Sequence, residues 1–196
     1  MVPGIADQGP ASRHGTHIAS VIFGQHGGSI TGIAPGCRGL IVPVFSDNGG
    51  DSIVAAQQVD LARAITQAVE AGANVINISG GQLTSSGEAS QWLLNAVQDC
   101  FDNNENIVAA AGNDGCQCLH IPAAMPTVLA VGAMNAQGLP FDLSNWGDAY
   151  QTQGILAPGE NILGAVPGGG IARKSGTSFA APIVSGSVAL SQIVGM

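Results

Sequence analysis

The chain has 196 residues, of which 45% are hydrophobic and only 9% are charged, and its formal net charge is -8. Only five residues are basic, too few for a phosphate-binding surface, which argues against binding to nucleic acid. No apolar run approaches the ~20 residues of a membrane span, so we expect no membrane partner. The N-terminal segment MVPGIADQGPASR lacks the apolar core of a signal peptide. We therefore expect a cytoplasmic protein, or a fragment whose natural N-terminus lies elsewhere.

Apolar runs typical of strands alternate with helical patterns along one domain that spans residues 1–196. In chain order we predict a helix at 17–23, a strand at 38–45, a helix at 52–71, a strand at 74–79, a helix at 87–103, strands at 106–112 and 127–134, two short strands within 155–166 and a helix at 177–193. Continuously apolar strands separated by helices indicate an α/β fold of three layers, α/β/α, with a mainly parallel sheet. Ligands bind beyond the carboxyl ends of such strands, so functional residues are expected just after Phe45, Ser79 and Gly112.

Four cysteines are present, Cys37, Cys100, Cys116 and Cys118. The CxC spacing of the last two differs from the CxxC pairs typical of zinc sites, and no second close pair accompanies it. Four cysteines allow three pairings. We expect free thiols, with one disulfide as the alternative, because a core so poor in charge needs no covalent staple.

Ser178 lies in the segment SGTSFAAP, at the start of a predicted helix of small residues. A hydroxyl in the first turn of a helix lies near unpaired backbone N–H groups and the positive end of the helix dipole, which stabilise an oxyanion formed there. The small side chains of Ala180 and Ala181 let a substrate backbone approach. The alternative is a serine that only caps the helix, which the motif taken alone favours.

Two further residues could take part in acyl chemistry. His14, in HGTHIAS, precedes an apolar helix and can exchange a proton near neutral pH. His17, one turn later, is interpreted as a packed or hydrogen-bonded residue. Asn113, in AAAGNDG, follows a buried strand, where its amide is a suitable neutral donor to a developing oxyanion. Taken alone, a histidine such as His14 is structural or exposed in most proteins, and an asparagine such as Asn113 is more often a simple turn residue.

The motifs HGTH, NISGG, AAAGN and GTSFAAP occur in this order along the chain. In these motifs the sequence resembles the subtilisin-like serine proteases (the subtilases) over nearly its whole length. The resemblance implies that His14 is the general base, Ser178 the nucleophile and Asn113 the oxyanion donor beside the Ser178 backbone N–H. We expect no cofactor and no metal site, because the loop FGQHGGSITGIAP is shorter than the calcium-binding loop of secreted subtilisins and lacks its asparagine-rich ligands.

The resemblance also implies a binding surface for a peptide or protein substrate in extended conformation. It assigns the edge that pairs with the substrate to Ser79, Gly80 and Gly81, and one wall of the primary specificity pocket to Ala110, Ala111 and Gly112. His120 falls where the family places the floor of that pocket, and the alternative is a surface-loop residue. NISGG has one residue fewer than the family pattern between the serine and the glycine pair, which changes the register of the substrate edge.

One part of the family pattern is missing. A subtilase has its acid, base and nucleophile in that order, and the acid lies at the end of an earlier strand. Asp7 is the only carboxylate residue before His14, and it lies in a Pro/Gly-rich segment that is not typical of a strand. The next candidates, Asp47 and Asp51, follow the next predicted strand. We therefore expect a peptidase domain that lacks its N-terminal strand and the catalytic Asp, with weak or no activity for this polypeptide.

Within the family, the details FGQHGG, INISGGQ, AAAGNDGCQCLHIPAA and SNWGDAY most resemble the subtilases of cyanobactin maturation. Those enzymes cut ribosomally made precursor peptides, and one kind joins the ends of the product into a ring. The sequence thus predicts a serine endopeptidase that processes a precursor peptide through an acyl-enzyme. The alternatives are a peptide macrocyclase of the same family, or a non-catalytic peptide-binding pseudoprotease, because the triad Asp is absent.

Overall fold

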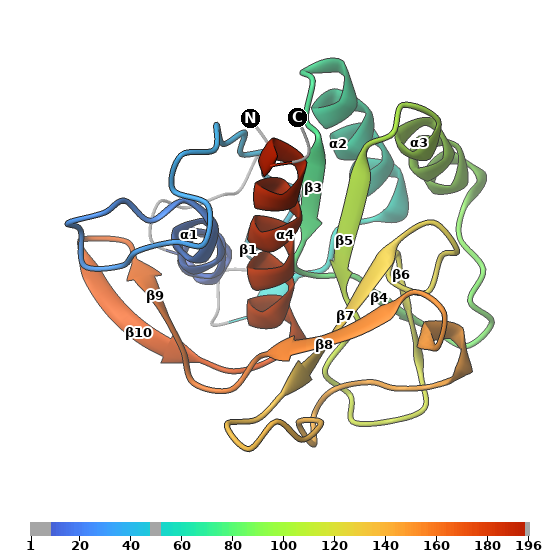
Figure 1. Cartoon of the computed structure of the whole chain (residues 1–196). Helices are drawn as coiled ribbons and strands as arrows, with labels where there is room; N and C mark the ends of the chain where they lie inside the picture. Colours follow the sequence, from blue (N-terminus) through green and yellow to red (C-terminus); the bar gives the residue numbers. More distant parts are fainter. Residues whose placement is uncertain (1–8, 48–51, 195–196) are drawn as a thin grey trace.

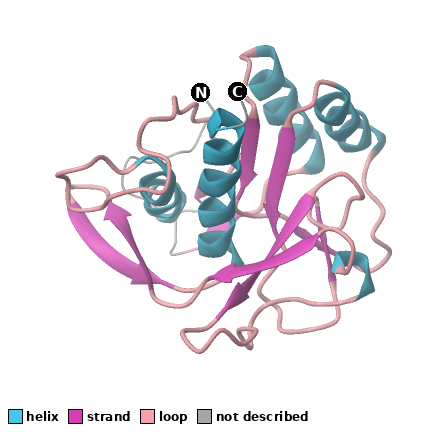
Figure 2. Ribbon diagram, in the orientation of Figure 1, coloured by secondary structure: helices cyan, strands magenta, loops and turns pink. Residues whose placement is uncertain are grey.

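The computed structural model describes residues 9–47 and 52–194. A four-stranded sheet forms the middle layer, with β3 (Val75–Ile78), β5 (Asn106–Ala110), β7 (Leu129–Met134) and β8 (Gly154–Pro158) in that order and all parallel. Helices α2 (Gln58–Glu70) and α3 (Gln91–Asp102) cover one face, and α4 (Thr177–Val194) covers the other (Figures 1 and 2). The predicted three-layer α/β/α fold with a parallel sheet is confirmed.

Alternate residues of the central strand β5 enter two separate apolar clusters. Ile107 and Ala109 pack with the residues of α2 and α3, whereas Val108 and Ala110 pack with α4. Every position of the strand is therefore buried except its first residue, which explains why the sequence is continuously apolar there. On the α4 side the contacts come from small residues such as Ala180, so that this helix lies close to the sheet.

The remaining elements are attached to this three-layer body. Helix α1 (Pro10–Phe23) packs against α4 and against β9 (Ile162–Val166), which forms an antiparallel hairpin with β10 (Gly170–Lys174). Strands β4 (Gln82–Thr84) and β6 (Leu119–Ile121) form a second antiparallel pair. Two short strands, β1 (Ser46–Asp47) and β2 (Ile53–Val54), also pair, and a 3-10 helix spans Asp148–Tyr150.

The strand predicted at 38–45 is wrong. This segment forms no strand, and the side chains of Leu40 and Ile41 are 49% and 66% exposed. Within the described residues the sheet ends at β3, and the apolar run does not pair with this edge strand. Hydrophobicity alone does not show whether such a partner exists.

Three helix starts also differ from the predictions. Helix α3 begins at Gln91 rather than at residue 87, because the Ser90 side chain caps it by accepting the Leu93 N–H. Helix α1 begins at Pro10 rather than at residue 17, because a proline is well tolerated at the first helical position, and His14 therefore lies inside the helix. Helix α2 begins only at Gln58, because Ile53 and Val54 pair with β1 instead.

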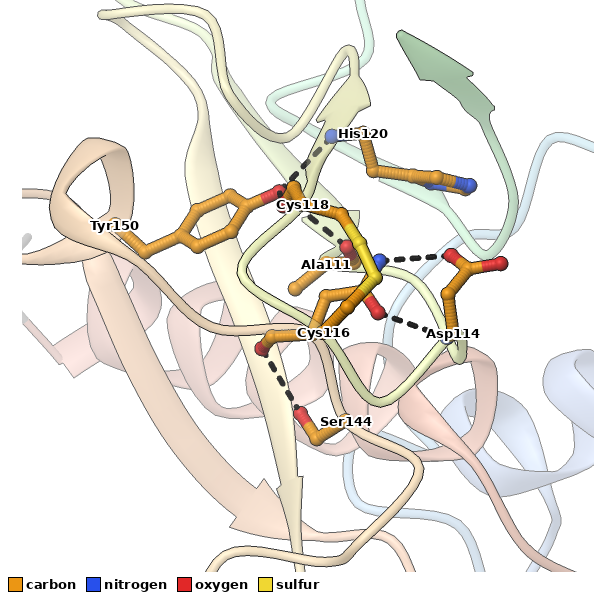
Figure 3. The surroundings of a disulfide bond; sticks show 8 residues. Ala111, Asp114, Cys116, Cys118, His120, Ser144 and Tyr150 are labelled. Carbon is orange, nitrogen blue, oxygen red and sulfur yellow. Dashed lines mark hydrogen bonds between the residues drawn. A yellow bond between two sulfur atoms is a disulfide. The ribbon is translucent and has the colours of Figure 1, made fainter. Parts of the chain in front are cut away.

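The cysteines behave in two ways. Cys37 and Cys100 are free thiols, as predicted. For Cys116 and Cys118 that prediction is wrong, because the chain reverses between them, brings their Cα atoms to 5.2 Å and pairs them in a disulfide (Figure 3).

Within residues 9–47 and 52–194 no helix is long and apolar enough to cross a membrane. Within the same ranges no three His, Cys, Asp or Glu residues are grouped so that they could hold a metal ion.

Substitution of Gly164 tests the contact between α1 and the β9–β10 hairpin. A Cβ at this position would lie 2.6 Å from atoms of the buried His17 ring, whose Nε2 lies 3.1 Å from the Ile162 carbonyl oxygen. We expect Gly164→Ala to lower the free energy of unfolding by about 1–3 kcal/mol in urea titrations. Gly15→Ala is the control: no atom lies within 4 Å of its Cβ, so it should stabilise α1 by about 0.5–1 kcal/mol. A neutral Gly164→Ala would show that the hairpin can move away.

Candidate active site

The structure places Ser178 at the second position of α4, with 9% of its surface exposed. Gly176, immediately before the helix, has φ +137°, a conformation that side chains rarely adopt. Its carbonyl accepts the N–H groups of Phe179 and Ala180 at 3.0 and 3.3 Å, which closes the first turn. The N–H groups at the start of the helix have no intrahelical acceptor, so the Ser178 hydroxyl lies where negative charge is stabilised.

His14 reaches the same site from α1. Its ring packs edge-on against the ring of Phe179, the residue that follows Ser178 in α4, with centroids 5.2 Å apart. The His14 Nε2 lies 3.1 Å from the carbonyl oxygen of Ser79, at the end of β3. The ring of His17 also packs against the Phe179 ring, with centroids 4.8 Å apart, and His17 is completely buried. This agrees with the packed role predicted for His17.

Burial lowers the pKa of His14 from its usual value near 6.5. The Ser79 carbonyl opposes this shift, whereas the positive charges of Lys174 and His17 add to it. No carboxylate in residues 9–47 or 52–194 contributes to the shift. The imidazole is therefore held neutral, the form in which it can accept a proton.

The candidate acids do not reach His14 within the described residues. Asp47 binds the first turn of α1 instead, where its Oδ1 accepts the Ala11 N–H at 2.7 Å and its Oδ2 is buried without a hydrogen-bond partner. Asp7 and Asp51 lie outside the described residues. The prediction that the domain lacks its acid-bearing strand is not tested here and stays a prediction.

Asn113 is held beside the start of α4 by Thr177. Its Oδ1 accepts the Thr177 N–H at 2.8 Å and lies 3.1 Å from the Thr177 Oγ1. A backbone N–H can only donate, so the atom facing it must be the amide oxygen, and the Asn113 Nδ2 group is left as a donor on the other side. The Thr177 hydroxyl also accepts the Gly112 N–H at 3.2 Å. Thr177, fully buried, was missed in the sequence, although it stands directly before the nucleophile in GTS.

The segment predicted to pair with the substrate connects β3 to β4. A Cβ on Gly80 would lie 2.5 Å from the ring of Phe45, and one on Gly81 would lie 2.5 Å from the carbonyl oxygen of Ile121. Gly81 is thus required by the close approach of two backbones, whereas Gly80 faces the tip of an aromatic side chain. The Ser79 hydroxyl accepts a hydrogen bond from Asn77 Nδ2 at 2.9 Å, which anchors the start of the segment.

The predicted wall of the specificity pocket continues from the carboxyl end of β5. Ala110 and Ala111 are buried, and Gly112 has φ +103°. A Cβ on Gly112 would lie 3.0 Å from the ring of His120. The structure places His120 in β6, where it lies between the predicted wall and Gly81, rather than in a surface loop.

His120 is held in place by its backbone. Its N–H donates to the Tyr150 hydroxyl at 2.9 Å, and that hydroxyl donates to the Cys118 and Ala111 carbonyls at 3.1 and 3.4 Å (Figure 3). Burial lowers the pKa of His120, and the nearby Asp114 carboxylate opposes the shift. The buried His120 Nδ1 has no hydrogen-bond partner and lies on the Gly81 side of the ring, whereas the Cδ2 atom faces Gly112.

Comparisons with known proteins agree with this arrangement. A model of the subtilase family matches residues 4–193. The thermophilic serine proteinase of Bacillus sp. (strain AK1) is 35% identical over 181 residues, which are 91% of this chain and 42% of that protein. The major intracellular serine protease of Bacillus subtilis (strain 168) is 36% identical over 183 residues, which are 90% of this chain and 54% of that protein. The chain thus spans about half the length of these curated relatives.

Several solved structures share more of the sequence. The patellamide maturation protease PatA is 61% identical with a TM-score of 0.88, over 99% of this chain and 71% of that one. The prenylagaramide maturation protease PagA is 59% identical with a TM-score of 0.88, over 95% of this chain and 70% of that one. The PatG macrocyclase in complex with peptide is 40% identical with a TM-score of 0.82, over 91% of this chain and 52% of that one. The predicted resemblance to maturation proteases is confirmed, and the chain belongs to the subtilase family of serine proteases.

Proposed function

We propose that the chain carries the base, the nucleophile and the oxyanion site of a serine endopeptidase that processes a precursor peptide. The observation that carries this proposal is the bond from Thr177 to Asn113, because it aims the Asn113 Nδ2 donor at the space beside Ser178. The maturation proteases PatA and PagA, at 61% and 59% identity, support a precursor as the substrate.

Each group has one step in the proposed reaction. His14 takes the proton of the Ser178 hydroxyl while the Ser178 Oγ attacks the carbonyl carbon of the scissile bond. The carbonyl oxygen becomes an oxyanion that accepts hydrogen bonds from the Asn113 Nδ2 group and the Ser178 N–H. The C–N bond then breaks, His14 returns the proton to the leaving amine, and an acyl-enzyme ester remains. Water, again deprotonated by His14, hydrolyses the ester.

The substrate is proposed to lie as an extended strand between two segments of the chain. Ser79, Gly80 and Gly81 would pair with its backbone on one side. The wall formed by Ala110, Ala111 and Gly112, with His120 beside it, would hold the side chain of the residue before the cut. The peptide-bound structure of the PatG macrocyclase, at 40% identity, supports peptide binding on this scaffold.

The acid that would orient His14 has to come from outside residues 9–47 and 52–194. In subtilisin, loss of the acid alone lowers kcat by about 3 × 10⁴, against about 2 × 10⁶ for the serine or the histidine. Without that acid, the site is therefore expected to react slowly.

A second candidate function is peptide macrocyclisation. It is favoured by the similarity to the PatG macrocyclase, at 40% identity and a TM-score of 0.82. The chemistry differs only in the group that attacks the acyl-enzyme, which is the amino end of the same peptide instead of water. Mass spectrometry separates the two outcomes, because a ring weighs one water less than the linear product.

Labelling of Ser178 by a fluorophosphonate probe tests the proposed nucleophile. We expect a slow, single-site adduct on Ser178, located by peptide mapping, and none in the Ser178→Ala variant. The complete absence of labelling in the folded protein would show that the site is a pseudoprotease. Robust turnover that Asp7→Asn abolishes would instead show that Asp7 acts as the acid.

Thr177 is expected to act on the reaction through Asn113. Thr177→Val keeps the shape of the side chain but removes the hydroxyl that binds Asn113 and Gly112, so the labelling rate should fall about tenfold. Thr177→Ser should restore most of the rate. In an Asn113→Ala background, Thr177→Val should have no further effect. A full additional loss there would mean that Thr177 only stabilises the fold.

The labelling rate should depend on the protonation of His14. Because burial lowers the pKa of His14, the active neutral form persists to lower pH. The rate should be constant at neutral pH and lost as the pH falls through a midpoint below 6.5. The residual reaction of His14→Ala should lack this step. A midpoint above 6.5 would indicate that a carboxylate pairs with His14 in solution.

A further inference from the structure

Lys174 is the only lysine in a chain with 13 acidic residues. It is the last residue of β10, and its side chain is half-buried. Its Nζ lies over the ring of Phe179, 5.9 Å from the centroid, and the same ring contacts His14 at 5.2 Å. A single aromatic ring, that of Phe179, therefore contacts both the ammonium group and the proposed general base.

The positive charge of Arg13 acts on this cation, and no carboxylate among the described residues opposes it. Among the described residues no carboxylate pairs with Lys174. Burial lowers its pKa, and the positive charge of Arg13 lowers it further. Lys174 in turn lowers the pKa of His14. A half-buried cation without an anionic partner is costly, and a cation–π contact offsets only part of that cost.

The neighbouring residue shows the contrast. Arg173 precedes Lys174 on β10, so its side chain points to the opposite face of the hairpin. There the guanidinium of Arg173 donates to the Asn161 carbonyl oxygen at 2.7 Å. Two adjacent cations thus have different environments: one is bonded to the chain itself, and the other faces the active site.

The position of β10 indicates which part of a substrate would meet Lys174. The β4–β6 pair, which carries His120 and borders the proposed acyl-side pocket, lies on one side of the amino end of α4. The β9–β10 hairpin lies on the other side (Figure 1). His14, which returns the proton to the leaving amine, packs on the Phe179 ring that Lys174 covers. The leaving-group part of the peptide should therefore pass Lys174.

We propose that Lys174 determines specificity by binding a carboxylate of the substrate within the first three residues after the scissile bond. This inference rests on the proposed endopeptidase function. The ligand is a carboxylate, supplied either by an Asp or Glu side chain or by the free C-terminus of a short leaving peptide. Its negative charge would neutralise the field of Lys174 at His14, so an acidic substrate makes the base more basic when it binds. Acidic substrates should therefore show a higher kcat as well as a lower KM.

Sequencing the new N-termini from a digested peptide library tests the proposal. For the natural chain we expect Asp and Glu to be enriched about fivefold over Asn and Gln at the first three positions after the cut. Lys174→Met should abolish this enrichment and Lys174→Glu should reverse it in favour of Lys and Arg. Arg173→Met, which removes the same charge from the other face, should leave it unchanged. A flat profile for the natural chain overturns the proposal, even when Ser178 is labelled.

Peptides that end two residues after the cut distinguish the two sources of the carboxylate. If the free acid is cleaved faster than the amide, the C-terminus is a ligand. If the two react equally and only Asp or Glu side chains accelerate cleavage, the side chain is the ligand. Equal rates for all of these peptides contradict the proposal.

A binding experiment keeps the proposal testable in the absence of turnover. Because Lys174 is the only lysine, Ser178→Ala protein labelled with 13Cε-lysine gives one lysine signal. The peptide amide Ala-Asp-Gly-Gly should shift this signal and raise the pKa of Lys174, whereas Ala-Asn-Gly-Gly should not. Identical responses to both peptides overturn the proposal. Failure of Ser178 to react with fluorophosphonate bears only on the proposed endopeptidase function.

Discussion

The hydrogen bonds of Thr177 are the interaction on which the rest of the site depends. Its backbone N–H and hydroxyl both bind the Asn113 amide oxygen, at 2.8 and 3.1 Å, and its hydroxyl also accepts the Gly112 N–H at 3.2 Å. One fully buried side chain therefore joins the amino end of α4 to the carboxyl end of β5. The proposed nucleophile and the proposed oxyanion donor come from these two elements, so their spacing follows from the packing of a helix on a sheet. Small residues such as Ala180 allow that packing.

Close approach of backbones is the second constraint. A Cβ on Gly81 or Gly112 would meet the ring of His120, and Gly112 has a φ of +103° that favours glycine. The Tyr150 hydroxyl then ties the pocket wall to β6 through the carbonyls of Ala111 and Cys118. The segments proposed to bind the peptide are thus bonded to each other, so little freedom would be lost when a substrate orders them.

Charge is distributed unevenly over this framework. The chain has a net charge of -8, yet the Lys174 Nζ lies over the Phe179 ring that His14 also contacts, and the positive charge of Arg13 lowers the pKa of this lysine. In a chain with so few cations, these two side chains make the electrostatic potential beside the proposed active site more positive than the negative net charge would suggest. Burial of His14 lowers the pKa of its imidazole, and the positive charge of Lys174 lowers it further, which favours the neutral form.

The amino-acid sequence alone determined the layers of the fold and the chemistry of its motifs. Strands such as β5 and β7 must be apolar at nearly every position because both faces of the sheet are covered, and His14, Asn113 and Ser178 lie in short motifs whose chemistry is local. Only the tertiary structure decided the rest. Residues 38–45 have the same apolar pattern but no strand beside them, and Thr177 and Asn113 meet across 64 positions of the chain. Lys174 becomes part of the site only because β10 folds back over Phe179. Periodicity and local chemistry are written residue by residue, whereas contacts between distant segments exist only after the chain has packed.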